Sequence, residues 1–266
     1  MIDVNDTNII LDKAHSELKK KFSNGYELVV LSVVGSHSYG TNTDISDIDI
    51  KGIYLPPAAN ILGLDVIEHI QLEKFLVSNN KEVEGILYSF NKWINLVIKQ
   101  NPSIITLLWN TPDLILESSK YWKYIDDFKY NLLSKRLKTS CIQYVNAQSW
   151  RAMRINLEKN VNEKRADDIK KVGYSTKNMV QIIYLLSLAK SSLQSTGPIV
   201  KIKDTKFIHD ILNYKYSYDE LNQFIDKEIQ EIEELSNISS LQESLNLKNI
   251  SNFKVKLLLE WLNGKK

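Results

Sequence analysis

The stretch from Val29 to Pro57 constrains the fold of this chain more than any other part of the sequence. It begins with the apolar, mostly β-branched run Val29 to Val34, which is too short for a helix and therefore predicts a buried strand. Gly35 closes this run and allows the backbone to leave the strand and to approach a ligand closely. Residues Ser36 to Ser38 then predict a short helix, whose free backbone N–H groups suit an anion such as phosphate.

A second strand is predicted directly after the polar turn at residues 41–44, over the run Ile45 to Leu55. Side chains of a strand alternate between its faces, so Asp47 and Asp49 share one face and the isoleucines that follow them take the other. Carboxylates about 7 Å apart on one face repel each other unless a cation lies between them. A phosphate-binding turn followed by a divalent-metal site is suited to phosphoryl or nucleotidyl transfer.

Two short motifs, Gly35-Ser36 and then Asp47-Ile48-Asp49, resemble the signature of the DNA polymerase β nucleotidyltransferase superfamily. The longer string GSHSYGTNTDISDIDIKGIYLPP is similar to one branch of it, the predicted nucleotidyltransferases associated with RNA repair. The resemblance implies that Asp47 and Asp49 hold two Mg²⁺ (or Mn²⁺) ions and that a third acidic residue lies on a later strand. It also implies that Gly35 and Ser36 hold the β- and γ-phosphates of a nucleoside triphosphate.

The resemblance continues in KEVEGILYSFNKWINLVIKQNPSIITLLW, where an acidic residue precedes a Tyr-Ser pair and a helix ends in Asn-Pro. Glu84 is the position that matches the third carboxylate, as both a catalytic and a metal-binding residue, with Glu82 as the alternative. A fainter match lies in GYSTKNMVQIIYLLSLAKSSLQSTG, where the branch usually has Lys, His and Arg on one helix. Lys177 fits that pattern and is a candidate nucleotide-binding residue, but Gln181 and Tyr184 stand in place of the His and the Arg.

Three other site motifs are excluded by the residues of the same stretch. An EF-hand loop would need a ligand at Lys51 and a bidentate Glu at Ala58. A nucleophile elbow would need Gly in place of Ser36. A P-loop would need Lys followed by Ser or Thr at Thr41-Asn42.

Composition is that of an ordinary globular chain of 266 residues, long enough for about two domains, with a net charge of only +2. Any contact with nucleic acid therefore has to come from a local basic patch. The single cysteine, Cys141, excludes an internal disulfide. The acidic N-terminus does not have the order of a signal peptide, and no apolar run approaches the ~18 residues that would span a bilayer, so the expectation is a cytoplasmic protein without membrane contact.

The resemblance, together with the strand and helix signals, implies an α+β fold: a polymerase-β-like nucleotidyltransferase domain with a small mixed sheet at residues 1–115, then an all-helical domain at residues 116–266. The boundary is placed near Thr111 to Ser119, because strand signals almost vanish beyond it. Helical spacing or strand composition marks further elements. They are helices from Thr7 to Phe22, with Ile10, Ala14 and Leu18 on one face, from Phe90 to Lys99 and after Pro102. Strands are predicted from Val66 to Leu72 and from Val83 to Tyr88, joined through Ser78-Asn79-Asn80, and the strand that contains Glu84 is expected to neighbour that of Asp47.

Basic residues of the second half supply further candidates. Arg151 and Arg154 share a helix face at spacing i and i+3 beside Trp150, which makes them candidates for binding a triphosphate or an RNA backbone. The alternative interpretation of such residues is a solvated helix face. His37 lies beside the predicted site, where it either contacts phosphate or caps the turn.

The predicted function is a two-metal, Mg²⁺-dependent nucleotidyltransferase that moves a nucleoside monophosphate from a nucleoside triphosphate to an acceptor hydroxyl. An RNA 3′ end is the acceptor that the resemblance implies, and a small molecule such as an aminoglycoside or a protein side chain fits the same chemistry. The alternative is a catalytically degenerate nucleotide-binding or interaction module, which the Gln181 and Tyr184 positions favour and the intact aspartate pair opposes. The sequence does not indicate the preferred nucleotide or the oligomeric state.

Overall fold

The computed structural model describes residues 2–44, 46–152, 163–194 and 197–264. Contacts divide the chain into two compact units, each of which is described by itself. The first consists of Met1–Leu133 together with Leu245–Lys266, and the second is Ser134–Ser244.

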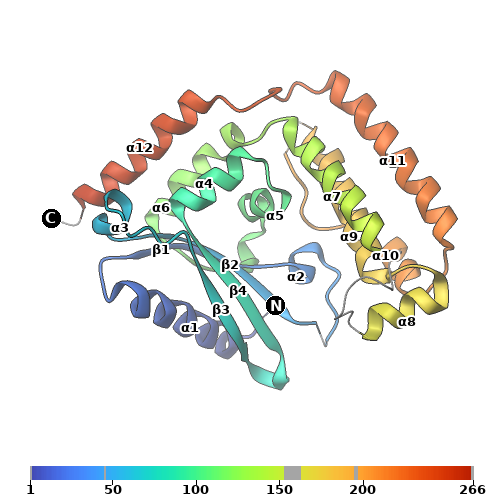
Figure 1. The fold of residues 1–266 in the computed structure, drawn as a ribbon, viewed down its shortest axis with the longest axis horizontal. Helices are drawn as coiled ribbons and strands as arrows, with labels where there is room; N and C mark the ends of the chain where they lie inside the picture. The colour runs from blue at the N-terminus through green and yellow to red at the C-terminus, as the bar shows by residue number, and fades with distance from the viewer. Residues whose placement is uncertain (1, 45, 153–162, 195–196, 265–266) are drawn as a thin grey trace. The chain divides into compact units, whose positions relative to one another are not determined.

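A five-stranded mixed sheet forms the centre of the first unit, with the strand order β3-β4-β2-β1-β5 (Figure 1). Strand β2 pairs antiparallel with β1 and parallel with β4, while β3 and β4 form an antiparallel hairpin. The bounds are β1 Glu27–Val34, β2 Ile48–Leu55, β3 His69–Leu76, β4 Glu82–Ser89 and β5 Ile115–Ser118. Both predicted later strands are thus confirmed, as is the prediction that the strand of Glu84 neighbours the strand of the aspartates.

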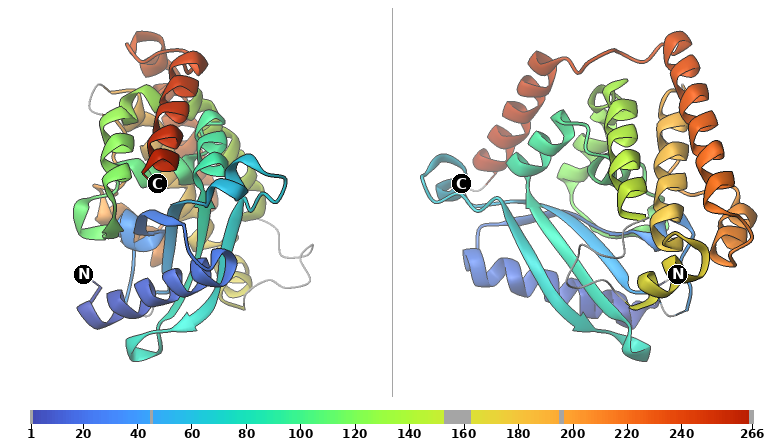
Figure 2. Two further views of the ribbon diagram at one scale, coloured as in Figure 1. Left: turned by 90° about the vertical axis from the view of Figure 1, so that its left-hand side faces the viewer. Right: turned by 45° about the vertical axis from the view of Figure 1, so that its right-hand side comes forward.

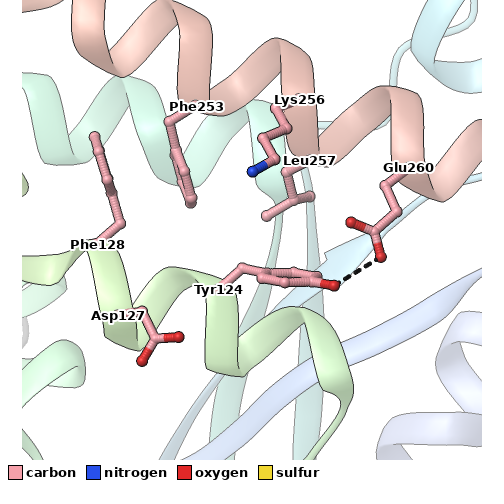
Figure 3. A pocket seen from close by; sticks show the side chains of 7 residues that line it. All are labelled: Tyr124, Asp127, Phe128, Phe253, Lys256, Leu257 and Glu260. Atoms are coloured by element: carbon pink, nitrogen blue, oxygen red, sulfur yellow. Dashed lines mark hydrogen bonds between the residues drawn. The ribbon is translucent and has the colours of Figure 1, made fainter.

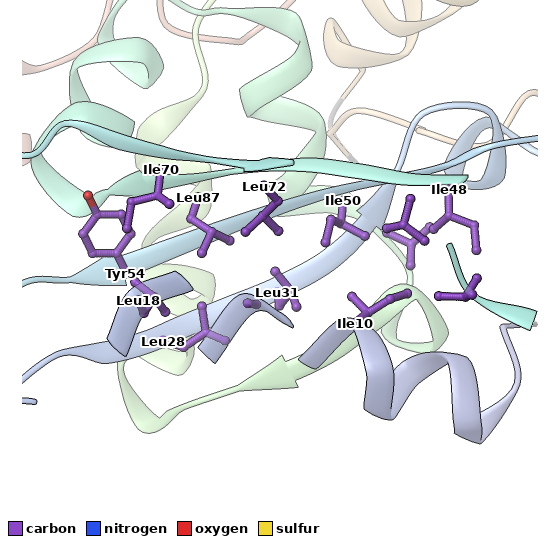
Figure 4. Close-up of a cluster of buried hydrophobic side chains, with 14 residues drawn as sticks. Ile10, Leu18, Leu28, Leu31, Ile48, Ile50, Tyr54, Ile70, Leu72 and Leu87 are labelled. Atoms are coloured by element: carbon purple, nitrogen blue, oxygen red, sulfur yellow. The ribbon is translucent and has the colours of Figure 1, made fainter. Parts of the chain in front are cut away.

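Helix α1, Val4–Phe22, packs on one face of this sheet (Figure 2). Its predicted apolar face, Ile10, Ala14 and Leu18, is fully buried, and Asp3 caps the helix by accepting hydrogen bonds from the N–H groups of the first turn. The strands contribute alternate residues to the same cluster (Figure 4). These are Leu28, Leu31, Val33, Ile48, Ile50, Tyr54, Ile70, Leu72, Val83 and Leu87.

The opposite face of the sheet carries the other set of alternating residues, including Asp49 and Glu84. Short helices adjoin this face: α2, Ser36–Tyr39, contacts β1 and β2, and α4, Phe90–Ile98, contacts β2 and β4. Helix α5, Pro102–Ile105, begins at the Asn-Pro pair, where Asn101 caps it. The remaining short elements are α3 Ala58–Leu62 and the 3₁₀ turns η1 Ser78–Asn80, η2 Thr106–Trp109, η3 Pro112–Leu114 and η4 Lys129–Leu132.

Two segments of the first unit extend beyond residue 115, where its end was predicted. Strand β5, Ile115–Ser118, crosses the predicted boundary and pairs with β1. Helix α12, Leu247–Asn263, was counted in the helical domain, but it groups by its contacts with the first unit. Trp261 of α12 is buried, and its indole N–H donates to the carbonyl of Pro56 at 2.9 Å.

The second unit is all-helical in its described residues, as predicted for this part of the chain. Helices α7 and α9 make the most extensive contact in it, and α10 and α11 pack on α9. The bounds are α7 Arg136–Ala152, α8 Glu163–Val172, α9 Thr176–Ser192, α10 Thr205–Leu212 and α11 Tyr218–Ile238. A further helix of the first unit, α6, spans Lys120–Phe128. Nowhere in the described part of the chain is a helix both long and apolar enough to cross a bilayer.

Candidate functional site

Asp49 lies at the middle of a row of residues that crosses three strands. Its pairing partner on β1 is Val34, and its partner on the parallel strand β4 is Glu84. Paired residues of neighbouring strands point to the same face of a sheet, so the carboxylates of Asp49 and Glu84 both project from the face opposite the main core. Asp49 and Glu84, which are 35 positions apart in the sequence, therefore lie side by side.

Gly35 lies directly against the carboxylate of Asp49. Its φ of 66° lies in the left-handed region, and a Cβ atom built on it would lie 2.1 Å from Oδ2 of Asp49. Only a residue without a side chain leaves room for this carboxylate. The backbone at Gly35 thus lies directly against the Asp49 carboxylate, and Ser36 follows it as the first residue of α2. The roles of Gly35 and Ser36 in binding phosphate stay predictions.

Asp47 is exposed and directly precedes β2, while Asp49 is the second residue of that strand. The strand begins three residues later than predicted; residue 45 lies outside the described residues. Asp47 is thus held by the end of the loop and not by strand pairing, which leaves its side chain less constrained than that of Asp49.

Glu84 is exposed and faces a lysine. The ammonium of Lys74 on β3 lies 3.9 Å from a Glu84 carboxylate oxygen and 2.7 Å from one of Glu82. The hydrogen bond with Glu82, more than any other contact, raises the pKa of Lys74. Opposite charges attract, so the Lys74 ammonium interacts with both carboxylates, and the shorter distance makes Glu82 its closer partner.

A metal site needs side chains that converge. Carboxylate oxygens are the ligands that Mg²⁺ prefers, and the register of β2 and β4 places two of the three carboxylates side by side. As placed in the described residues, however, no three His, Cys, Asp or Glu side chains are grouped closely enough to hold a metal ion. The donor chemistry fits magnesium, and the roles of Asp47, Asp49 and Glu84 as metal ligands stay predictions.

Lys51 adjoins this site, although the sequence motifs indicate for it only that an EF-hand is absent. Its side chain shares the face of Asp49, and burial lowers the pKa of its ammonium to about 8, opposed by the charge of Asp49. It donates to the carbonyl of Ser103 on α5 at 3.2 Å and also to the hydroxyl of Ser103. The sequence contains a signal for this position, because the alternation that places Asp47 and Asp49 on one face of the strand also places Lys51 there.

The half-buried imidazole of His37 projects from α2. Burial lowers its pKa, and a hydrogen bond with the backbone of Ser46 opposes this effect. Its Nε2 atom is buried and has no hydrogen-bond partner among the described residues. The ring is therefore neutral at pH 7 and offers a hydrogen bond, not a charge, next to the loop that leads to Asp47.

The predicted basic residues belong to the second unit. Lys177 is exposed in the first turn of α9, and Arg151 is exposed in the last turn of α7. Arg154 lies outside the described residues. On the same α9 helix Gln181 is exposed, whereas Tyr184 is buried.

A separate hollow of about 280 Å³ lies between α6 and α12 in the first unit (Figure 3). The rings of Phe128 and Phe253 stack there at 4.2 Å, and the Tyr124 hydroxyl donates to Glu260 at 3.0 Å. None of the predicted site residues lines it. These contacts hold α12 against α6 and explain why the C-terminal helix belongs to the first unit.

Comparison with known proteins gives the same family as the sequence motifs. The family model described as "RlaP: RNA repair pathway DNA polymerase beta family" matches residues 11–256. A 38.9 kDa protein from the nrdC-mobD intergenic region of Enterobacteria phage T4 is 34% identical over 126 residues, which are 46% of this chain and 37% of the phage protein. The chain therefore spans little more than a third of that relative.

Among solved structures, a nucleotidyltransferase-like protein from Exiguobacterium sibiricum 255-15 is similar to this chain with a TM-score of 0.32 and 13% identity. The match covers 86% of this chain and 74% of that protein.

Proposed function

Because the chain belongs to the RNA repair pathway DNA polymerase beta family, we propose that it transfers a nucleoside monophosphate from a nucleoside triphosphate to an acceptor hydroxyl. The observation that carries this proposal is the arrangement of Gly35, Asp49 and Glu84. The turn at Gly35, which has no side chain, lies against the Asp49 carboxylate, and Glu84 on β4 is the direct neighbour of Asp49.

Asp47, Asp49 and Glu84 would hold two Mg²⁺ (or Mn²⁺) ions. When bound, these ions neutralise phosphate charge and lower the pKa of the acceptor hydroxyl. Gly35 and Ser36 would bind the β- and γ-phosphates through backbone N–H and hydroxyl donors, and Glu84 would orient the attacking oxygen. The acceptor oxygen would attack the α-phosphorus in line, with loss of the hydroxyl proton to water, to form the new P–O bond and break the bond to pyrophosphate, which leaves.

Lys177, Arg151 and Arg154 would neutralise negative charge on the triphosphate or on an RNA backbone. Exposure of Lys177 and Arg151 is consistent with this role. The proposed acceptor is an RNA 3′ end, which rests on the family description alone. A small molecule or a protein side chain would use the same site chemistry.

A non-catalytic nucleotide-binding module is the second candidate. Two observations favour it: the described carboxylates do not group as a metal cluster, and Gln181 and Tyr184 replace the His and Arg that the family pattern predicts. Both candidates bind nucleotide, so only a transfer assay separates them.

The experiment is incubation with Mg²⁺ or Mn²⁺, each labelled nucleoside triphosphate in turn, and a mixture of total RNA and cell protein. The Asp47→Asn variant is tested in parallel, and Asp65→Asn, in an exposed loop of the same unit, is the matched control. Label that reaches one polymer with the wild type and the control, but not with Asp47→Asn, establishes the transfer and identifies the acceptor class. Tight nucleotide binding without transfer would instead support the binding module.

A further inference from the structure

Lys51 places a positive charge next to the candidate site. It follows Asp49 by two residues on β2, so the two side chains project from the same face of the sheet, about 7 Å apart along the strand. The Asp49 carboxylate is close enough to act on the Lys51 ammonium electrostatically. Any phosphate that is bound at Asp49 therefore lies near this cation.

The hydrogen-bond acceptors of Lys51 are uncharged. Its Nζ atom donates to the backbone carbonyl of Ser103 at 3.2 Å and to the Ser103 hydroxyl. The charged group that acts on it is the carboxylate of Asp49. An ammonium has three N–H donors, so these two contacts leave one for a ligand.

The Lys51 side chain is half-buried between β2 and α5. Partial loss of water costs a cation free energy unless an anion compensates it. The two Ser103 oxygens satisfy hydrogen bonds but do not supply negative charge, and the Asp49 charge that does is the one a bound metal ion and phosphate would share. A phosphate oxygen supplies both the charge and an acceptor, which a neutral ligand does not.

Ser103 is itself held in place. Its N–H donates to Oδ1 of Asn101 at 3.1 Å, and Pro102 between them starts α5 with a fixed φ. The Asn-Pro-Ser turn thus fixes the direction in which the Lys51 side chain extends. A preorganised donor binds its ligand with a smaller entropic loss than a free lysine does.

We propose that Lys51 contacts the phosphate chain of the nucleotide held at Asp49, through a hydrogen bond from its ammonium to a non-bridging oxygen, and that Ser103 is the residue that positions it. This inference rests on the proposed function, because it requires a phosphate at Asp49.

The test is calorimetric titration of the whole chain with magnesium pyrophosphate, with ATP and with adenosine. Lys51→Met is expected to weaken binding of pyrophosphate and ATP about 10- to 100-fold, the usual range for one charged hydrogen bond, and to leave adenosine binding unchanged. Lys123→Met, at an exposed position of α6, removes the same charge elsewhere in the unit and is expected to bind like the wild type. The melting temperature of Lys51→Met without ligand is expected to stay level or rise, because an apolar side chain replaces a partly desolvated charge.

Ser103 gives an independent variant should Lys51→Met fail to fold. Ser103→Ala is expected to weaken pyrophosphate binding about tenfold, and Ser103→Thr, which keeps the hydroxyl, is expected to restore it. Equal pyrophosphate affinity in the wild type, Lys51→Met and Ser103→Ala would overturn the role of Lys51 alone. A wild type that binds neither ATP nor pyrophosphate would remove the proposed function and this inference together.

Discussion

Gly35 lies so close to Asp49 that a single methyl group at position 35 would overlap the carboxylate, with 2.1 Å between its Cβ and Oδ2. Gly35 directly follows β1 and Asp49 lies on β2, and the antiparallel pairing of Val34 with Asp49 brings the two residues together. The backbone conformation at Gly35 and the position of the Asp49 carboxylate therefore depend on each other.

Gly35→Ala is expected to lower nucleotide transfer by about 10²-fold, because the new methyl group displaces Asp49, and a shift of about 1 Å at a catalytic group has an effect of that size. Gly173→Ala is the matched control: its φ of 82° is also positive, but no atom lies within 4 Å of its added Cβ. Both variants should lose about 1–3 kcal/mol of stability, because Ala is strained at a positive φ. Equal transfer rates in the two variants would contradict the linkage between Gly35 and Asp49.

The identity of the third carboxylate can be decided by comparing Glu84→Gln with Glu82→Gln. Glu84 is in register with Asp49, whereas Glu82 pairs with Leu76 and holds the Lys74 ammonium at 2.7 Å. Glu84→Gln is expected to reduce transfer at least about 10²-fold, because loss of a group that stabilises the transition state electrostatically has an effect of that size. Glu82→Gln should stay within about twofold of wild type, since an exposed ion pair contributes little. The reverse order in a steady-state transfer assay would assign the role to Glu82.

Asp49→Asn is expected to abolish transfer and to leave the fold intact, because Asn has nearly the same shape and Asp49 lies at the partly exposed face of the sheet. Circular dichroism and thermal melting check the fold, and labelled-nucleotide transfer checks activity. An unchanged transfer rate would remove Asp49 from the mechanism.

The second unit has a pH-sensitive ion-pair cluster at Asp210. The hydrogen bond from Lys206, followed by that from Lys215, lowers the pKa of Asp210 from 3.8 to about 2. Because the folded pKa is the lower one, the stabilisation is complete above about pH 4 and is lost as the pH falls towards 2. Asp210→Asn should therefore be less stable than wild type at pH 7, with a difference that shrinks between pH 4 and pH 2 in denaturant titrations. Asp226→Asn, at an exposed position of α11, removes one carboxylate elsewhere in the unit and is the control variant.

The one thiol of the chain is expected to be inert in the folded protein. Cys141 on α7 is fully buried, and burial raises its pKa. Since thiolate is the reactive form, labelling by a disulfide reagent should be more than about 100-fold slower in native buffer than in denaturant. Cys141→Ala provides the blank. Rapid labelling of the native chain would show that α7 opens readily around this position.

Local patterns in the sequence were sufficient for most elements of the sheet and for the family. Apolar periodicity predicted α1 with its buried face of Ile10, Ala14 and Leu18, and strand composition predicted the β3–β4 hairpin. The Gly-Ser and Asp-x-Asp motifs identified the family that the comparison confirms. These features depend on residues within one or two turns or strands of each other, so the sequence carries them directly.

Contacts between distant segments were decided by the tertiary structure alone. The four-residue strand β5 is too short to give a periodic signal and exists because its backbone pairs with β1. Helix α12 joins the first unit through the buried Trp261 and its bond to Pro56 across 205 positions. The candidate site also depends on tertiary structure. Strand register makes Asp49 the neighbour of Glu84 and of the Gly35 turn, and the α5 turn fixes the position of Lys51. Pairing register and long-range packing minimise the free energy of the whole fold, and no local stretch of sequence contains that information.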